Sequence, residues 1–225
     1  MIKLIVERVA RLLKGREVKI DPTVTDGYLF DLCLRYAFSL IRGLLRLRCR
    51  VWLGKGVSLQ AKSSLSLGKG VTIADYCLID ALGFEGVIIG DRSTIGRFSV
   101  LKVTGSLSQI GDGIKIGSDV GIGDFAHIGG AGGVIIGDDT IVGANFSVHP
   151  ENHVFSDPEV LIRHQGVTHE GIVIGSNCWI GAKVTVLDGA VIGSGCVVAA
   201  GAVVKGQFPD RCVIGGVPAR ILKMI

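Results

Sequence analysis

The chain has 225 residues, of which 48% are hydrophobic, 6% are aromatic and 34 are glycine. This length suits one elongated domain with a substantial core and a short appendage. The net charge of +4 comes from residues 1–50, which hold 11 Lys and Arg against 5 acidic residues, whereas the rest of the chain holds 13 against 15. Beyond residue 50 the sequence offers no basic face with interleaved aromatic residues, which argues against a nucleic-acid-binding role.

The first 50 residues predict a separate helical segment. Over residues 1–14, apolar positions fall on one helical side and charged positions largely on the other. Gly15 interrupts the pattern, and residues 21–27 are typical of a turn. Over residues 28–50, four arginines share an arc of about 80° on a helical wheel, and three leucines lie opposite. These residues are Arg35, Arg42, Arg46 and Arg50, and Leu40, Leu44 and Leu47. The sequence therefore predicts a basic amphipathic helix, weakened at Gly43.

Two positions for this basic helix stay open. Its longest stretch without a charge, Tyr36 to Ile41, has 6 residues, far short of the roughly 20 needed to cross a bilayer. The helix can lie on a membrane surface, where basic amphipathic segments bind anionic lipid. It can instead pack on the start of the following domain or on a neighbouring subunit.

From residue 51 onward, an aliphatic residue followed by glycine recurs at intervals of six. Clear examples are Ile110-Gly111, Ile116-Gly117, Ile122-Gly123 and Ile128-Gly129. A six-residue period drifts around an α-helix but stacks on one face of short strands joined by turns. We therefore predict a parallel β-helix over residues 51–214, with aliphatic side chains inside and glycines supplying the corner angles. Coils about 4.8 Å apart would give roughly seven coils in a rod on the order of 33 Å tall. A tail, residues 215–225, follows.

One long interruption, residues 149–173, breaks the repeat after Val148. Loops that leave a stack of repeats are common places for function. This loop holds four of the five histidines: His149, His153, His164 and His169. A histidine with a pKa of about 6.5 can accept a proton at neutral pH, as attack by a hydroxyl on a thioester requires.

The six cysteines form no C-x-x-C pair, and the N-terminus lacks the features of a signal peptide. Reduced thiols in a cytoplasmic protein are therefore expected. Cys178 lies one residue from a repeat position, so we interpret it as a small buried hydrophobe and not as a nucleophile.

The repeat, the run Asn177-Cys178-Trp179-Ile180-Gly181 and the closing Gly215-Gly216-Val217-Pro218-Ala219-Arg220 closely resemble the hexapeptide-repeat acyltransferases over about residues 51–225. The resemblance implies an all-β fold, a left-handed parallel β-helix of hexapeptide repeats, here with an N-terminal helical appendage. Left-handedness departs from the usual crossover preference and comes from the resemblance alone. The resemblance also implies a homotrimer that uses acetyl-CoA as co-substrate, closest to the sugar and polysaccharide O-acetyltransferases.

The resemblance also implies roles for single residues. The run from His149 to His153 is similar to the family loop whose second histidine is the general base, so His153 is the expected catalytic residue and His149 the alternative. Asn152 and His127 are expected to contact the acceptor. His153 would take the acceptor proton while backbone N–H groups stabilise the oxyanion, without a covalent acetyl-enzyme. An acid that orients the histidine is expected nearby, either Glu151 or Asp157.

The family's cofactor contacts map onto five positions. The pantetheine arm would contact Ala182, after Trp-Ile-Gly, and Ala200, in an Ala-Gly turn. The phosphates would meet basic residues of the late coils and tail, namely Lys205, Arg220 and Lys223. Lys205 stands one residue earlier than the lysine of the family's usual Val-Val-Thr-Lys-Asp.

The predicted function is acetyl-CoA-dependent O-acetyl transfer to a sugar or a surface-polysaccharide precursor. The expected location is the cytoplasm, peripheral to the inner membrane if residues 28–50 contact lipid. One alternative is a zinc hydratase of the carbonic anhydrase type with His127, His149 and His153 as ligands, because three imidazoles and a water suit catalytic zinc. A non-catalytic scaffold is a third interpretation. The sequence leaves open the acceptor, O- versus N-acetylation, and whether the acyl group is acetyl.

Overall fold

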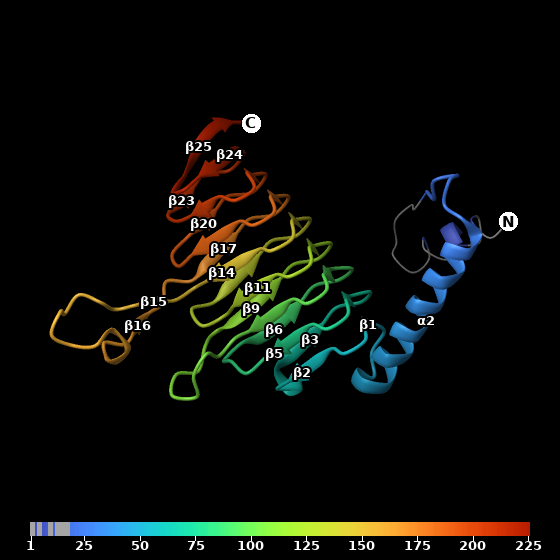
Figure 1. Cartoon of the computed structure of the whole chain (residues 1–225), viewed down its shortest axis with the longest axis horizontal. Helices are drawn as coiled ribbons and strands as arrows, with labels where there is room; N and C mark the ends of the chain where they lie inside the picture. Colours follow the sequence, from blue (N-terminus) through green and yellow to red (C-terminus); the bar gives the residue numbers. More distant parts are fainter. Residues whose placement is uncertain (1–2, 4–5, 9–10, 12–18) are drawn as a thin grey trace.

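A computed structural model describes residues 3, 6–8, 11 and 19–225. Short strands stack along a rod, helix α2 (Asp26–Leu47) lies at the end where the rod begins, and the C-terminal strands close the other end (Figure 1). The helix expected over residues 1–14 lies largely outside the described residues.

Three parallel sheets form the sides of the rod. Face A contains β1 (Trp52–Leu53), β4 (Thr72–Ile73), β7 (Thr94–Ile95), β10 (Gly121–Ile122), β13 (Ile141–Val142), β18 (Trp179–Ile180), β21 (Val197–Val198), β24 (Cys212–Gly216) and the antiparallel β25 (Ala219–Met224). Face B contains β2 (Ser58–Gln60), β5 (Leu78–Asp80), β8 (Val100–Lys102), β11 (His127–Gly129), β14 (Ser147–His149), β19 (Thr185–Leu187) and β22 (Val203–Val204). Face C contains β3 (Leu65–Leu67), β6 (Gly86–Ile89), β9 (Gly113–Ile116), β12 (Val134–Ile136), β17 (Ile172–Ile174), β20 (Val191–Ile192) and β23 (Gln207–Phe208).

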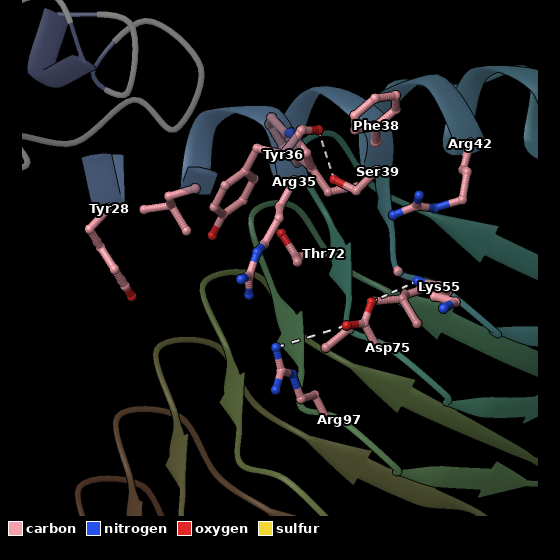
Figure 2. Close-up of a pocket in the computed structure, with 15 residues that line it drawn as sticks. Tyr28, Arg35, Tyr36, Phe38, Ser39, Arg42, Lys55, Thr72, Asp75 and Arg97 are labelled. Atoms are coloured by element: carbon pink, nitrogen blue, oxygen red, sulfur yellow. Dashed lines mark hydrogen bonds and ion pairs between the residues drawn. The ribbon is translucent and has the colours of Figure 1, made fainter. Parts of the chain in front are cut away.

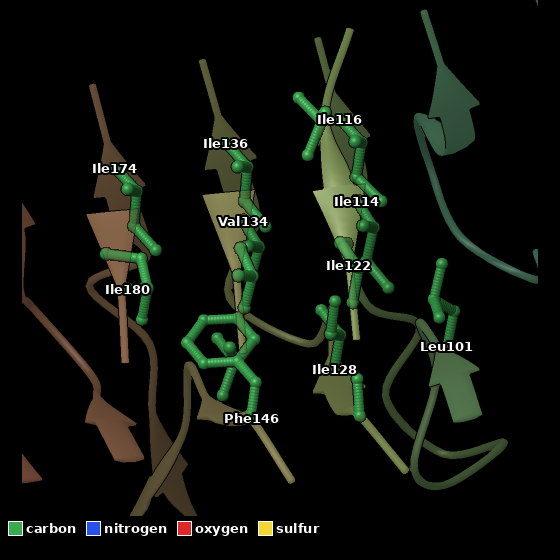
Figure 3. Close-up of a cluster of buried hydrophobic side chains, with 14 of the residues drawn as sticks. Leu101, Ile114, Ile116, Ile122, Ile128, Val134, Ile136, Phe146, Ile174 and Ile180 are labelled. Carbon is green, nitrogen blue, oxygen red and sulfur yellow. The ribbon is translucent and has the colours of Figure 1, made fainter. Parts of the chain in front are cut away.

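Each coil places an apolar side chain from every face into one continuous core. Figure 3 shows part of this stack, including Ile122, Ile128 and Ile136 of a single coil. Faces B and C have seven strands each, which confirms the predicted parallel β-helix of about seven coils. Ile110 was wrongly assigned to the repeat: it lies in a loop between β8 and β9 and is 36% exposed. In this coil, face C directs the buried side chain of Ile116 into the core.

The glycines of the aliphatic-Gly pairs have a different role from the one predicted. In Gly137 and Gly175 the backbone does not adopt the left-handed region; instead, an added Cβ would overlap the next coil. At Gly137 that Cβ would lie 2.6 Å from the backbone nitrogen of Ser176 and 2.7 Å from the carbonyl carbon of Gly175. These glycines are therefore required because adjacent coils approach closely.

The left-handed corner angle falls on another position, three residues after each buried aliphatic. At the corner between faces A and B these residues are Gly56, Tyr76, Phe98, Phe125, Asn145, Lys183 and Gly201. Most are not glycine, although non-glycine residues adopt this conformation at a cost of about 1 kcal/mol. Hydrogen bonds between coils offset that cost, as in Lys183 N–H to the Ala144 carbonyl at 2.8 Å.

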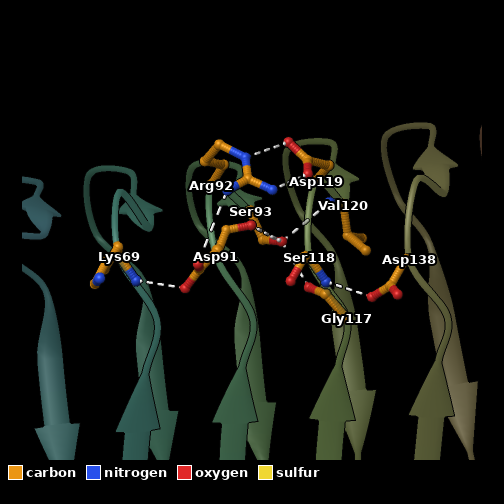
Figure 4. Close-up of polar contacts among 9 residues, drawn as sticks. All are labelled: Lys69, Asp91, Arg92, Ser93, Gly117, Ser118, Asp119, Val120 and Asp138. Carbon is orange, nitrogen blue, oxygen red and sulfur yellow. Dashed lines mark hydrogen bonds and ion pairs between the residues drawn. The ribbon is translucent and has the colours of Figure 1, made fainter. Parts of the chain in front are cut away.

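Polar side chains also link successive coils at the corner between faces C and A. Asp91 Oδ1 accepts from the Lys69 N–H at 2.8 Å, and Asp138 Oδ1 accepts from the Ser118 N–H at 2.7 Å (Figure 4). The buried Ser93 hydroxyl donates to the Gly117 carbonyl at 2.7 Å and accepts from the Val120 N–H at 3.0 Å. Among the described residues, every fully buried side-chain nitrogen or oxygen has a hydrogen-bond partner, as expected of a stable interior.

Helix α2 packs against the first coil, which is one of the two positions that the sequence left open. Arg42 Nε donates to the Leu53 carbonyl at 2.8 Å and Arg46 donates to the Val57 carbonyl at 2.8 Å. Gly43 permits this approach, because a Cβ there would overlap the Val51 carbonyl oxygen. Arg50 lies beyond the helix end. The leucines predicted opposite the arginines do not share one environment, because Leu47 packs on the core whereas Leu44 is exposed.

The excursions from the repeat gather at the corner between faces B and C. They are residues 81–85, residues 103–112 and the long loop 149–171, which carries β15 (Asn152–His153) and β16 (Val167–Thr168). Figure 1 shows the longer two projecting from the same side of the rod. Short 3-10 turns, η1 (Lys62–Ser64) and η2 (Ile162–His164), complete this corner. Insertions on one side of a repeat stack often mark the binding face.

The remaining predictions concern Cys178, the C-terminal motif and membrane-spanning helices. Cys178 is buried, as predicted, and its thiol donates to the Gly193 carbonyl at 3.2 Å. Burial raises the pKa of the Cys178 thiol, which disfavours the reactive thiolate. The closing motif forms the turn between β24 and β25. No helix of the described part of the chain is long and apolar enough to cross a bilayer.

Candidate active site

The long loop leaves and re-enters the rod at a buried carboxylate, Asp188. Its oxygens accept from the Asn152 side-chain amide at 3.1 Å on the outgoing strand and from the Gly171 N–H at 3.0 Å on the returning strand. The Glu170 N–H donates to the same carboxylate at 3.0 Å. Asp188 is only 2% exposed, so these bonds are shielded from water. One carboxylate therefore fixes both stems of the loop.

His153 follows the anchored Asn152 and lines a pocket of about 380 Å³. In β15, His153 lies opposite Val167 of β16. Besides these loop residues the pocket is lined by Ser106 and Gln109 of the 103–112 excursion and by Arg163. The two excursions of one corner therefore form a pocket that the predicted base helps to line.

The two acids proposed as orienters of His153 have other partners in the structure. Glu151 pairs with His169 at 3.1 Å, and both residues line the same pocket. Asp157 accepts from the Glu159 N–H at 2.9 Å within the loop. The loop therefore contains an acid–histidine pair, but the pair involves His169.

A second histidine pair lies on the exposed side of face B. The rings of His127 and His149 are 5.7 Å apart at 23°, and His149 Nε2 lies 2.7 Å from the Ser147 hydroxyl. Partial burial, together with repulsion from the neighbouring His127, lowers the pKa of His149. A lowered pKa keeps this ring neutral at pH 7, so it can exchange hydrogen bonds as donor and acceptor.

The predicted cofactor alanines lie in one column at the corner between faces A and B. Gly201 N–H donates to the Ala182 carbonyl at 2.9 Å, and Lys183 N–H donates to the Ala144 carbonyl at 2.8 Å. Ala144, Ala182 and Ala200 thus occupy equivalent places on three successive coils. Ala182 and Ala200 are exposed, and small side chains there leave the backbone accessible along the corner.

The predicted phosphate contacts lie at the C-terminal end of the rod. Lys205 follows β22, whereas Arg220 and Lys223 belong to β25, opposite Gly215 and Val213 of β24. All three basic side chains are exposed. The structure therefore places the alanine column and the basic residues in the late coils.

The three histidines of the zinc alternative do not form a metal site within one chain. Among the described residues, no group of three or more His, Cys, Asp or Glu is placed to hold a metal ion. His127 and His149 are neighbours on face B, whereas His153 lies in the loop pocket.

Two features of the site were missed by sequence reasoning. Ala144 follows Val142-Gly143 just as Ala182 follows Ile180-Gly181, so the repeat itself carried the signal. Asp188 had no such signal, because its importance depends on contacts with residues 17 to 36 positions away.

Comparison with known proteins gives consistent matches. Residues 171–206 match the family described as bacterial transferase hexapeptide (six repeats). WbbJ of Escherichia coli (strain K12), whose name assigns it to O-acetyl transfer in lipopolysaccharide biosynthesis, is 37% identical over 125 residues, covering 52% of this chain and 64% of WbbJ. Rv3034c of Mycobacterium tuberculosis (strain H37Rv), named as an acetyltransferase, is 31% identical over 210 residues, covering 92% of this chain and 60% of that protein. The chain thus spans less than two thirds of either relative.

A solved structure shares the fold. A point mutant of AntD, an N-acyltransferase from Bacillus cereus in complex with dTDP-4-amino-4,6-dideoxyglucose and coenzyme A, aligns with a TM-score of 0.53 at 21% identity, over 79% of this chain and 81% of AntD. The architecture is therefore a left-handed parallel β-helix of hexapeptide repeats. Residues 171–206 thus match the repeat of the bacterial hexapeptide transferases, and the chain is similar in sequence to proteins named as acetyltransferases.

Proposed function

We propose that this protein is an acetyl-CoA-dependent O-acetyltransferase that acts on a sugar or a surface-polysaccharide precursor. The observation that carries the proposal is the pocket around His153, which two excursions of one corner enclose and Asp188 anchors. The names of WbbJ and of the galactoside O-acetyltransferase of E. coli support a hydroxyl of a sugar as the acceptor.

In the proposed reaction, the imidazole of His153 accepts the proton of the acceptor hydroxyl. The oxygen attacks the thioester carbonyl of acetyl-CoA, the carbon–sulfur bond breaks, and the leaving thiolate takes the proton from the imidazolium, which releases coenzyme A and restores the base. Backbone N–H groups of a neighbouring coil would stabilise the oxyanion. The anchored stems support this role, because a base must be held within hydrogen-bond reach of the proton that it removes.

Asn152, His149 and His127 have supporting roles in this proposal. The Asn152 side chain is bonded to Asp188, so its amide positions the base instead of contacting the acceptor. Neutral His149 and its neighbour His127 present polar edges on face B, where they would hydrogen-bond sugar hydroxyls. His149 is also the alternative base. Its Nε2 lies 2.7 Å from the Ser147 hydroxyl, and this hydrogen bond would orient the ring for that task.

The cofactor would lie along the alanine column. The pantetheine arm would pass Ala144, Ala182 and Ala200, whose small side chains expose backbone groups for hydrogen bonding. Lys205, Arg220 and Lys223 would meet the phosphates at the end of the rod. Complexes of AntD with coenzyme A support this class of co-substrate.

We also propose a homotrimer. The histidine loop and the alanine column lie at different corners of one rod, so a neighbouring subunit would bring the loop of one copy to the column of the next. Ile141 and Trp179 are adjacent in register on face A and are 62% and 59% exposed. An exposed apolar pair of this kind favours a subunit interface, and cyclic symmetry is the common solution for identical subunits.

Peripheral membrane contact through residues 28–50 remains a proposal, with a changed physical basis. The exposed surface of α2 carries an apolar stripe of Phe30, Leu34, Phe38, Ile41 and Leu45, each between 41% and 78% exposed. Arg48 and Arg50 follow the helix end. Exposed aromatic and aliphatic side chains beside arginines suit the interface of an anionic membrane.

Acceptor-dependent release of coenzyme A tests the proposal directly. Purified protein is mixed with acetyl-CoA and a panel of glycosides and nucleotide sugars, and free thiol and acetylated product are measured. We expect both to appear in equal amounts with at least one hydroxyl acceptor. A stoichiometric zinc content together with bicarbonate formation, and no binding of coenzyme A, would replace the transferase with the hydratase. Transfer to amino sugars only would replace O- with N-acetylation.

A further inference from the structure

A second cavity, remote from the histidine pocket, lies between α2 and the first three coils. Its volume is about 500 Å³, within the usual range for small-molecule sites. Figure 2 shows side chains of α2 above it and side chains of the rod below it, with Arg35 and Arg97 directed into the space between them.

The cavity collects positive charge. Among the residues that the structure describes, four cationic side chains line it and Asp75 is the single carboxylate in the lining. The cations are Arg35 and Arg42 of α2, and Lys55 and Arg97 of the corner between faces A and B. Like charges gathered around one hollow repel one another unless an anion or solvent compensates them. The charge balance therefore favours an anionic ligand.

The partners of these cations leave part of their charge available. Arg42 donates to a neutral carbonyl, that of Leu53. Arg97 lies 3.8 Å from Asp75, whose other oxygen accepts from the Lys55 backbone N–H at 2.7 Å. Arg35 pairs with Asp31 at 2.6 Å, but both side chains are more than half exposed, and such surface pairs are weak.

The composition of the lining favours phosphate. Guanidinium groups present several N–H donors in a planar fork that matches phosphate oxygens. Tyr28, Ser39 and Thr72 add hydroxyl groups to the lining. Two arginines approaching from opposite walls can bind one phosphate group together, which neither helix nor rod could do alone.

The cavity also adjoins an apolar surface. Phe38 lines the cavity and belongs to the apolar stripe along α2. A ligand with a phosphate group in the cavity could therefore lay a hydrocarbon chain along Phe38, Ile41 and Leu45. This continuity of charged hollow and apolar stripe is the property of a site for an anionic amphiphile.

We propose that the α2 cavity binds the phosphate group of an anionic amphiphile, such as a phospholipid or a lipid-linked sugar phosphate, whose chain lies on the apolar stripe. This site goes beyond the acetyl-transfer function and stands independently of it. It would hold the rod at a membrane surface through a specific headgroup contact and not through diffuse charge.

The test compares two charge-matched double variants. Arg35→Gln with Arg97→Gln removes two cavity cations and keeps Arg42, which supports the fold. Lys62→Gln with Lys115→Gln removes two exposed cations at distant places on the rod, in η1 and β9. Binding of inorganic diphosphate is measured by calorimetry, and binding to phosphatidylglycerol and phosphatidylcholine vesicles by co-sedimentation. Circular dichroism checks that each variant is folded.

We expect the cavity variant to bind diphosphate and phosphatidylglycerol vesicles at least tenfold more weakly than the wild type, and the control variant to match the wild type. Phe38→Ser with Leu45→Ser should weaken vesicle binding alone. Diphosphate binding that needs the arginines, without vesicle binding, would retain the phosphate site and assign it to a soluble ligand. Equal affinities of the wild type and the cavity variant for both probes would overturn the proposal, whether or not the protein transfers acetyl groups.

Discussion

The two corners that flank face B follow opposite rules. Between faces A and B, the left-handed residue always comes three positions after the buried aliphatic, as in Ile122 and Phe125 or Ile180 and Lys183. Between faces B and C, the chain takes 6 residues from Val186 to Ile192 but 26 from Val148 to Ile174. The regular corner maintains the stack of coils, and the irregular corner can carry side chains for chemistry because its loops are not bound by the repeat.

The comparison predicts that the largest effect on catalysis comes from the irregular corner. His153→Ala should lower kcat by about 10²-fold or more with little change in acetyl-CoA affinity, because a general base acts in the transition state. Steady-state kinetics and calorimetric binding of coenzyme A measure the two effects. His164→Ala, in the same loop, is the matched control and should behave as wild type. A mild effect of His153→Ala beside a severe effect of His149→Ala would move the base to His149.

Substitutions at the regular corners, including the corner between faces C and A that contains Gly137, should instead lower the stability of the fold. Gly137→Ala places a Cβ 2.6 Å from the Ser176 nitrogen, so the coils must separate, at a cost of about 2 kcal/mol. The melting temperature should fall by roughly 4–8 °C. Gly121→Ala is the matched control, since a Cβ there meets nothing within 4 Å, and its melting temperature should be unchanged or slightly higher. Equal melting temperatures for both variants would contradict the close-approach explanation.

Asp188 lies in the short turn of the next coil and anchors the long loop above it, and its effect should be intermediate. In Asp188→Asn, one acceptor oxygen becomes an N–H₂ donor, so the Asn152 amide must turn round to keep its hydrogen bond and a charged acceptor is replaced by a neutral one. We expect kcat to fall about tenfold, since the base is held less firmly. Acetyl-CoA affinity and the shape of the pH profile of kcat/KM should be retained, because Asp188 positions the base without exchanging protons.

Limited proteolysis separates this positioning role from general destabilisation. Asp188→Asn should be cleaved faster within residues 153–167 than elsewhere. Asp157→Asn makes the same charge change within the loop itself, where its carboxylate only accepts from the Glu159 N–H at 2.9 Å, and should leave cleavage and kcat unchanged. A uniform rise in cleavage over the whole chain in Asp188→Asn would mean that Asp188 stabilises the fold as a whole and does not position the base.

The sequence predicted what the repeat encodes and missed what depends on three-dimensional contacts. The aliphatic positions, the seven coils and the long loop follow from spacing alone, because one buried side chain per turn is a local requirement. Ile110 was assigned to the repeat because a glycine follows it at the expected interval, but the chain leaves the rod at this point. The position of α2 was left open by the sequence, because a helical wheel shows which residues share a side but not that Arg42 and Arg46 can donate to the backbone carbonyls of Leu53 and Val57.

The candidate site divides in the same way. The candidate histidines and the cofactor alanines were selected from sequence through the resemblance to the hexapeptide-repeat acyltransferases, and their roles stay proposals. Asp188 could not be selected from sequence, because its carboxylate acts on Asn152 and Gly171 across the neck of a loop. The pairing of Glu151 with His169 likewise depends on how the two strands of the hairpin meet.

The smallest predicted effect concerns the histidine pair on face B. Partial burial and the charge of His127 both oppose protonation of His149 and lower its pKa. His127→Gln removes the second cause, so the pKa of His149 should rise toward its ordinary value of 6.5, and an NMR titration of the ring protons measures the change.

The folded state binds this proton less readily than the unfolded chain, so His149 contributes stability above pH 6.5 that is lost as the pH falls toward the lowered pKa. His127→Gln should therefore flatten the dependence of the unfolding free energy on pH in that window. His164→Gln is the control, since it removes a histidine of the loop and leaves the pair intact. An unchanged titration of His149 in His127→Gln would mean that burial alone sets its pKa.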